Sequence, residues 1–348
     1  MSENSPIRVL VVDDSKVVCR VLSNELNKDP DLTVVGTAPD PYVAREMILQ
    51  HEPQVITLDL EMPRMDGLSF LRKLMKHHPL PVIIVSSTTP KGCSTALKAI
   101  AEGAVDVMSK PREGYTLGKM TKELIRKIKV AATIDCDRRP IDQLIRSEVG
   151  DLRDYAGANN IMLAMGASAG GTVVIEKILK KMPPNLPGAV VVQHMPEIFT
   201  EKLAARLDSV TKLSVSEAQS GDVIESGRVL IAPGGKHLLV KKNGESFFAD
   251  VRDGPTVNRH RPSVDVLFNS VARAAGPKAV GVLLTGMGND GAAGLLEMRR
   301  AGASTIAQDE STSVVFGMPR VAIECGAADE GVPLDRIPGR IIALLEAA

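Results

Sequence analysis

A hydroxyl, an imidazole and a carboxylate each follow an apolar run in the second half of the chain. Ser168 lies in GASAGG, His194 in QHMP and Asp290 in TGMGNDGAAG. A serine is a poor nucleophile until a base takes its proton, and the base needs an acid that fixes its tautomer. If the three runs are strands of one parallel sheet, the three side chains lie along one edge of it. These residue types therefore form a candidate nucleophilic triad for acyl transfer.

The glycines around Ser168 favour a turn that presents a nucleophile. GASAG fits the G-x-S-x-G pattern of a nucleophile elbow, in which small residues let a strand turn sharply into a helix. A helix beginning near Thr172 would direct its first N–H groups at the site, as an oxyanion hole requires. A tight connection and a phosphate-binding loop are alternatives, although the stretch lacks the Lys-Ser/Thr of a P-loop. The chain order Ser, His, Asp also differs from that of α/β-hydrolases.

A second set of polar residues lies at the ends of apolar runs in the first half. Asp13 and Asp14 follow the first run, Asp59 follows the third, Ser86 the fourth and Lys110 the fifth. Three carboxylates at one sheet edge are costly unless a cation lies among them, and oxygen ligands with room for water suit Mg²⁺. A carboxylate beside Mg²⁺ and a lysine can attack phosphorus and become an acyl phosphate. Each residue taken alone is also consistent with a helix cap.

Short β-branched runs alternate with amphipathic segments over residues 7–130, which predicts a five-stranded parallel α/β domain. The expected strands are 7–12, 33–36, 55–58, 82–85 and 104–108. Helices are expected to begin near Ser15, Asp40, Gly67 and Ser94, and a last one runs from 117 to 130. The domain assigned to this pattern is 1–130.

Residues 131–158 have interspersed charge of both signs and weak periodicity, so we predict a linker with a helical turn around 142–148. The alternation resumes in a second domain, 159–348, which we predict to be doubly wound α/β. Two extended runs around Asn243-Gly244 add an antiparallel hairpin. The expected strands are 161–165, 189–192, 229–232, 279–284 and 304–307. The expected helices are 172–182, 199–208, 264–274, 291–301 and 337–346.

The composition narrows the classes of function. The 348 residues contain 42 Lys+Arg and 42 Asp+Glu, so no global basic field attracts nucleic acid or anionic membrane. Aromatic residues make up only 3%, which disfavours base stacking. No apolar run is long enough to span a bilayer, and the N-terminus lacks the pattern of a signal peptide. Four dispersed cysteines suit a reducing compartment, so we expect a cytoplasmic protein.

The motifs of the first domain resemble those of a known family. VVDDS, LDLEMPRMDG, VSS and SKP, in this order and spacing, are similar to the receiver domain of two-component response regulators. The resemblance covers residues 7–130 and implies that a partner histidine kinase phosphorylates Asp59. It further implies that Lys110 pairs with the phosphoryl group and that Ser86 hydrogen-bonds to it.

The same resemblance implies a Mg²⁺ site for phosphorylation. Asp14, Asp59 and the Glu61 carbonyl would bind the ion, and Asp13 would act through water. Phosphorylation adds close to two negative charges and can bias a bistable surface that controls the second domain.

GASAGG, QHMP, IAPGGKH, RPSVDVLF and LLTGMGNDGAAG resemble the catalytic domain of the bacterial chemotaxis protein-glutamate methylesterases, the CheB family, which also deamidate receptor glutamines. With the receiver in front, the resemblance covers nearly the whole chain. It implies Ser168 as nucleophile, His194 as general base and then acid, and Asp290 as orienting acid. The Ala169 amide and the Met287 region would line the oxyanion site. The residue after the nucleophile is often Thr in the family, so Ala169 keeps only the backbone donor.

The resemblance also implies substrates and partners. A methyl ester and an amide both pass through a tetrahedral oxyanion, so one site without a cofactor can release methanol or ammonia. The substrates would be glutamyl side chains on the cytoplasmic helices of chemoreceptors, and a chemotaxis histidine kinase would be the phosphodonor. The unphosphorylated receiver would block access to Ser168. A non-hydrolytic output domain that binds DNA or a nucleotide is the alternative.

The sequence around two further histidines, His237 and His260, does not indicate a specific function. His237 opens an expected hairpin strand, and we predict a structural role for it. His260 lies in NRHRPS between Arg259 and Arg261. This loop either contacts an acidic receptor surface or is simply solvated.

Overall fold

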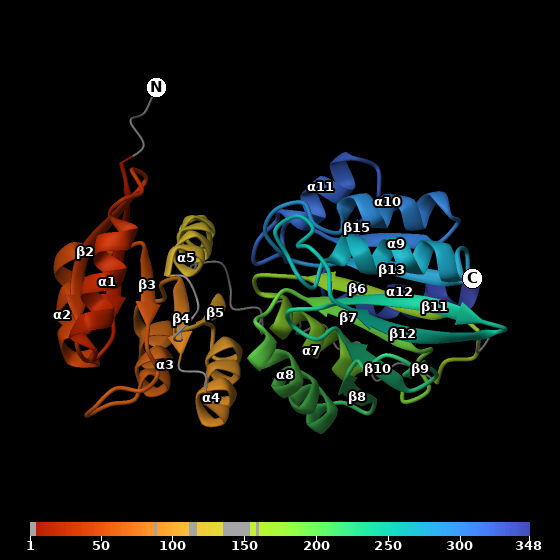
Figure 1. The fold of residues 1–348 in the computed structure, drawn as a ribbon, viewed down its shortest axis with the longest axis horizontal. Helices are drawn as coiled ribbons and strands as arrows, with labels where there is room; N and C mark the ends of the chain where they lie inside the picture. The colour runs from red at the N-terminus through yellow and green to blue at the C-terminus, as the bar shows by residue number, and fades with distance from the viewer. Residues whose placement is uncertain (1–4, 87–88, 111–116, 135–153, 158–159) are drawn as a thin grey trace. The chain divides into compact units, whose positions relative to one another are not determined.

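The computed structural model describes residues 5–86, 89–110, 117–134, 154–157 and 160–348 (Figure 1). The chain divides into two compact units, Met1–Arg138 and Arg139–Ala348, and each is described by itself. Most of the predicted linker 131–158, including its helical turn, lies outside the described residues.

The first unit is a five-stranded parallel sheet in the order β2-β1-β3-β4-β5, which confirms the predicted fold class. β1 and β3 lie side by side at its centre, so the residues that follow them meet at one edge. The strands are β1 (Ile7–Val12), β2 (Leu32–Ala38), β3 (Val55–Leu58), β4 (Val82–Ser86) and β5 (Asp106–Ser109). The helices are α1 (Lys16–Leu26), α2 (Pro41–His51), α3 (Gly67–His77), α4 (Pro90–Ala101) and α5 (Leu117–Ala131).

Side-chain caps explain where the helices of this unit begin. The side chains of Ser15, Asp40 and Asp66 accept hydrogen bonds from first-turn N–H groups of α1, α2 and α3. The predicted start of α4 near Ser94 is wrong, because the Thr89 hydroxyl accepts from the Gly92 N–H and the helix begins at Pro90.

The second unit contains a seven-stranded parallel sheet in the order β15-β14-β13-β6-β7-β10-β8 and a three-stranded antiparallel sheet, β11-β12-β9. β6 lies at the centre, between β7 and β13, so the sheet extends from β6 on both sides. The strands are β6 (Met162–Ala167), β7 (Ala189–Gln193), β8 (Ser214–Glu217), β9 (Val223–Ile224), β10 (Arg228–Ile231), β11 (His237–Asn243), β12 (Ser246–Arg252), β13 (Ala279–Leu283), β14 (Ser304–Gln308) and β15 (Glu330–Val332). The helices are α7 (Gly171–Lys181), α8 (Glu197–Val210), α9 (Val264–Ala275), α10 (Ala292–Arg300), α11 (Met318–Glu324) and α12 (Ile337–Ala347).

Four elements of this unit were not predicted: β8, β9, β15 and α11. They are short, and β8 and β15 form the two edges of the parallel sheet, where no long apolar run marks a strand. The predicted hairpin is present, and Gly244, at φ +60°, lies in its turn.

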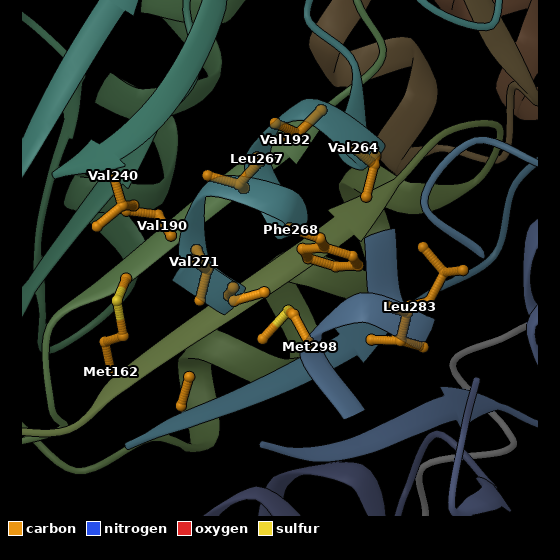
Figure 2. Packing of buried hydrophobic residues seen from close by; sticks show 14 of the residues in the cluster. Met162, Val190, Val192, Val240, Val264, Leu267, Phe268, Val271, Leu283 and Met298 are labelled. Carbon is orange, nitrogen blue, oxygen red and sulfur yellow. The ribbon is translucent and has the colours of Figure 1, made fainter. Parts of the chain in front are cut away.

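Eight of the twelve residues of α9 are buried, because the helix packs on more than one side. Its Leu267, Phe268 and Val271 pack with β6 and β7 of the parallel sheet and with Val240 of the hairpin (Figure 2). The hairpin therefore covers part of the core, and it fixes the position of α9. The N-terminus of this helix enters the candidate site described next.

Candidate active site

Ser168 lies on the turn that joins β6 to α7. Its N–H donates to the Thr285 carbonyl at 3.0 Å, and its carbonyl accepts from the Gly171 N–H at 2.8 Å. Gly170 has φ +75°, which a side chain would strain, and a Cβ there would lie 2.6 Å from Val314. These contacts hold the serine, which is half-buried, at the carboxyl end of the central strand.

His194 follows β7, the neighbouring strand. Its N–H donates to the Ala167 carbonyl at 3.0 Å. The amide of Gln193 donates to the carbonyls of Ser168 and His194, at 2.8 and 3.1 Å. One buried side chain therefore ties the turn of the serine to that of the histidine.

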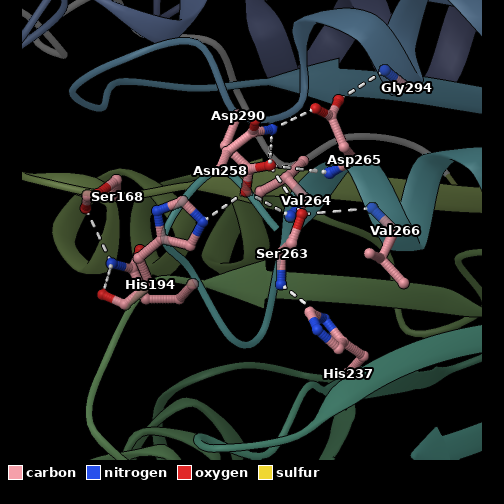
Figure 3. Close-up of polar contacts among 11 residues, drawn as sticks. Ser168, His194, His237, Asn258, Ser263, Val264, Asp265, Val266, Asp290 and Gly294 are labelled. Carbon is pink, nitrogen blue, oxygen red and sulfur yellow. Dashed lines mark hydrogen bonds and ion pairs between the residues drawn. The ribbon is translucent and has the colours of Figure 1, made fainter. Parts of the chain in front are cut away.

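The ring of His194 contacts Asp290, which follows β13 on the other side of β6. His194 Nε2 lies 2.8 Å from Asp290 Oδ2. Figure 3 shows Ser168 on the side of the ring that faces away from Asp290. His194 Nδ1 is buried and has no hydrogen-bond partner among the described residues. All three predicted residues therefore meet at one sheet edge, next to the strand where the order of connections reverses.

Asp290 is buried and fully hydrogen-bonded. Its Oδ1 accepts from Ser263 Oγ at 2.7 Å and Asn258 Nδ2 at 2.9 Å, and its Oδ2 accepts from the Val264 N–H at 2.7 Å. Burial alone would raise the pKa of this carboxyl, but the contacts with His194, Asn258 and Ser263 hold the pKa well below its usual range. The N-terminus of α9 adds favourable partial positive charge. Asp290 is therefore an ionised acid at neutral pH.

A second buried carboxylate, Asp265, shares Asn258 with Asp290. Asp265 Oδ2 accepts from Asn258 Nδ2 at 2.6 Å, and its Oδ1 accepts from the Gly294 N–H at 2.6 Å. Burial and, more weakly, the charge of Asp290 raise the pKa of Asp265. The Asn258 amide thus bridges two carboxyls with opposite pKa shifts.

Asn258 and Ser263 were missed at the level of sequence. Ser263 precedes the apolar segment VDVLF, so its role as N-cap of α9 was readable, and the structure shows the cap on Val266 N–H. Its second contact, with Asp290, depends on the packing of two distant segments. No sequence motif around Asn258 indicated its contact with Asp290. Asparagine is one of the residues that tolerate a left-handed φ, which is +49° here.

The two other histidines of the second unit, His237 and His260, have different surroundings. His237 is buried, accepts from the Ser263 N–H at Nδ1 and donates from Nε2 to the Pro255 carbonyl. This agrees with the predicted structural role. The ring of His260 stacks on that of His194, with centroids 3.7 Å apart and planes 6° apart. Its ring therefore faces the site, an arrangement that neither sequence interpretation of its loop includes.

The two predicted oxyanion residues lie close to Ser168. Ala169 is buried and follows the serine directly, one residue before the N-cap of α7. Met287 follows Gly286, where a Cβ would lie only 2.7 Å from Ser168 Cβ. The β13–α10 connection therefore touches the serine at a residue without a side chain.

Gly286→Ala is expected to disturb Ser168. The added Cβ would also lie 2.4 Å from Met318 Sδ in a fully buried position, so the backbone of one loop has to move. We expect a loss of about 1–3 kcal/mol in the free energy of unfolding and about tenfold slower labelling of Ser168 by a fluorophosphonate. Urea unfolding and labelling rates measure both. Gly339→Ala, which meets no atom within 4 Å, is the control, and equal behaviour of the two variants would contradict the expectation.

The first unit brings its own predicted residues together. Ligand oxygens of Asp13, Asp14 and Asp59 lie within 4.8 Å of one another, and Lys110 Nζ lies 2.8 Å from both Asp13 Oδ2 and Asp59 Oδ2. Burial raises the pKa of Asp59 despite the lysine. Burial alone would lower the pKa of Lys110, but the contacts with Asp13 and Asp59 outweigh it and raise this pKa. Three carboxylates and one ammonium group leave two net negative charges, and this oxygen-rich set fits a divalent cation.

Two further residues of this edge have clear positions. Ser86 is fully buried at the end of β4, and its hydroxyl donates to the Gly92 carbonyl at 3.4 Å. The Glu61 N–H donates to Asp59 Oδ1 at 3.3 Å.

Within the described ranges, no helix is long and apolar enough to cross a membrane.

These features define a class of protein: a receiver with an acidic phosphoacceptor-type edge, followed by a doubly wound α/β unit of hydrolase type. Residues 9–122 match the response regulator receiver domain, and residues 163–341 match the CheB methylesterase domain. The chain belongs to the CheB methylesterase family.

Individual relatives agree with this assignment. The chain is 54% identical to "Protein-glutamate methylesterase/protein-glutamine glutaminase 4" of Anaeromyxobacter dehalogenans, over 97% of this chain and 95% of the relative. It is 48% identical to a protein-glutamate methylesterase/protein-glutamine glutaminase of Syntrophus aciditrophicus, over 98% of this chain and 100% of the relative. The crystal structure of the Thermotoga maritima CheB methylesterase catalytic domain is 40% identical, with a TM-score of 0.52, and covers 53% of this chain and 98% of that one.

Proposed function

We propose that this chain demethylates glutamate methyl esters on chemoreceptors and deamidates receptor glutamines, with Ser168 as nucleophile, His194 as base and Asp290 as orienting acid. The observation that carries the proposal is the bond between His194 Nε2 and Asp290. It keeps a proton on Nε2 and leaves the lone pair of Nδ1, the nitrogen without a partner in the described chain, for Ser168. Family membership supplies the substrate class.

The proposed reaction has two halves. As Ser168 Oγ attacks the ester carbonyl, its proton passes to His194 Nδ1, and Asp290 stabilises the imidazolium. His194 then gives this proton to the leaving methoxide or amide nitrogen, which releases methanol or ammonia and leaves a glutamyl ester on Ser168. Water loses a proton to the same nitrogen and attacks the acyl carbonyl. The bond to Ser168 Oγ then breaks, His194 returns the proton to this oxygen, and the glutamate is released.

We assign the oxyanion to backbone donors of Ala169 and of the segment at Met287. The N–H of Ser168 itself is engaged with the Thr285 carbonyl, so the donors must come from its neighbours. The N-terminus of α7, at Gly171, adds partial positive charge on the same side. Because residue 169 is alanine, its side chain contributes no hydrogen bond.

Methanol release tests the function directly. Purified protein is incubated with membranes that contain methylated chemoreceptors, and released methanol is quantified against membranes alone. Release above this background supports the esterase, whereas a protein that releases none but is stabilised by a nucleotide would favour the non-hydrolytic alternative.

We further propose that phosphorylation of Asp59 controls this activity. Asp14, Asp59 and the Glu61 carbonyl would hold Mg²⁺, with Asp13 acting through water. The ion would neutralise charge on the phosphodonor. Lys110 forms an ion pair with Asp59 and would instead pair with the phosphoryl group after phosphorylation. Ser86 would hydrogen-bond to the same group. A chemotaxis histidine kinase in the cytoplasm would be the phosphodonor, and the unphosphorylated receiver would block Ser168.

A small phosphodonor is expected to raise methanol release by the wild-type chain on the order of tenfold. Asp59→Asn should abolish this rise because it removes the attacking carboxylate, and EDTA should suppress it in the wild type. Asp31→Asn, at an exposed carboxylate, is the matched control. The rate of methanol release with and without phosphodonor is the measurement.

A chain without residues 1–140 should be active without any phosphodonor. If this shorter chain were no faster than the unphosphorylated whole, occlusion of Ser168 by the receiver would be wrong. The relevant comparison is at equal protein concentration and with the same receptor membranes.

A further inference from the structure

The ring of His260 covers one face of the His194 ring. Their centroids are 3.7 Å apart and their planes are 6° apart, which is a parallel stack in contact. His260 is half-buried and His194 is buried, so the ring of His260 covers a ring that has little exposure of its own. A residue that only stabilised its own loop would not need to stack on His194.

The loop that carries His260 is held rigidly. Val257 and His260 exchange both backbone hydrogen bonds, at 2.8 and 3.0 Å. Between them, Asn258 and Arg259 have φ of +49° and +68°, a conformation that side chains disfavour. Asn258 bonds both Asp290 and Asp265, which ties the tip of the loop to the acid of the site. The strained turn thus places His260 over His194.

Asp290 alone fixes only one atom of the His194 ring. A single hydrogen bond at Nε2 allows the ring to tilt about that contact, and a small tilt moves Nδ1 away from Ser168. A flat neighbour at van der Waals distance removes this freedom, because a tilt would bring the rings into collision.

We infer that His260 is a positioning residue, which acts through His194 by holding its ring in the plane that directs Nδ1 at Ser168. The inference rests on the proposed function. It assigns a role to a loop, 257–260, that contributes no nucleophile, base or acid.

The test uses the full-length protein and three variants at position 260. His260→Ala removes the ring and is expected to lower kcat for methanol release about tenfold with KM unchanged, because receptor binding does not need the stack. His260→Phe keeps a flat ring and should restore most of kcat. His260→Gln keeps a polar group without a ring and should behave as the alanine variant. Thr256→Ala, at an exposed residue directly before this loop, should match wild type.

A spectroscopic measurement separates this inference from the proposed function. The downfield proton of the His194–Asp290 hydrogen bond should be visible by NMR in wild type and His260→Phe, and broadened in His260→Ala. Wild-type kcat in His260→Ala, or rescue by Gln but not by Phe, would overturn the inference. A wild-type chain without esterase activity would instead refute the proposed function, and the NMR comparison would still decide the role of His260.

Discussion

Ser168→Ala is expected to lower methanol release on the order of 10⁴-fold or more. In the proposed reaction the hydroxyl oxygen of Ser168 forms the acyl bond, and its nearest neighbours carry no group that could replace it: Ala167 and Ala169 flank it, and Gly286 faces it. The backbone contacts of Ser168 with Thr285, Gly171 and Gln193 do not involve the hydroxyl, so the fold should be unchanged. Methanol release and fluorophosphonate labelling measure the effect.

Ser209→Ala is the matched control for this variant. Ser209 is an exposed serine of α8, and its hydroxyl donates to a carbonyl of its own helix. It should keep both activity and labelling. Labelling that persists in Ser168→Ala would show that another residue is the nucleophile.

Asp290→Asn is expected to reduce kcat about 10⁴-fold while the chain still folds. The carboxylate only accepts, so it keeps the proton of His194 on Nε2. An amide placed there can donate to Nε2, which favours the tautomer with its proton on Nδ1. That nitrogen can then no longer accept the proton of Ser168. The loss should appear in kcat rather than in KM, because the carboxylate is buried behind the ring.

We also expect Asp290→Asn to change how the free energy of unfolding depends on pH. The pKa of Asp290 is lower in the folded than in the unfolded chain, so its ionised form stabilises the fold above about pH 4, the pKa of a free Asp. This contribution is lost as pH falls through the folded pKa. The difference in unfolding free energy between wild type and Asp290→Asn should therefore shrink from pH 7 to pH 3. Urea unfolding at both values measures it, with the exposed Asp253→Asn as control, and an equal difference at both pH values would contradict it.

The fold was predictable from the sequence where strands are buried on both faces of the sheet. Strands such as β1 and β4 are rich in β-branched and other apolar residues because helices cover both faces of a parallel sheet, and this pattern can be recognised without knowing which elements pack against the strand. Edge strands lack this signature, which is why β8 and β15 were missed. The start of α4 depended on a single cap, Thr89, within a run that has no clear periodicity.

The sequence by itself determined which residues meet. Ser168 and His194 directly follow apolar runs, Asp290 lies in the loop after another, and parallel strands bring their carboxyl ends to one edge, so their order along the chain made these three residues candidates. The resemblance to the methylesterase family then singled them out. The same reasoning placed Asp13 and Asp59 beside Lys110.

Only the tertiary structure decided how these groups are oriented and supported. The nitrogen of His194 that faces Asp290, the helix terminus and the Asn258 amide that stabilise this carboxylate, and the His260 stack all join segments far apart in sequence. Such contacts depend on distances of a few ångströms between packed elements, whereas hydrophobic periodicity reports only which face of an element is buried. Residue types and strand order therefore predict the chemistry of the site, and packing sets the geometry through which that chemistry proceeds.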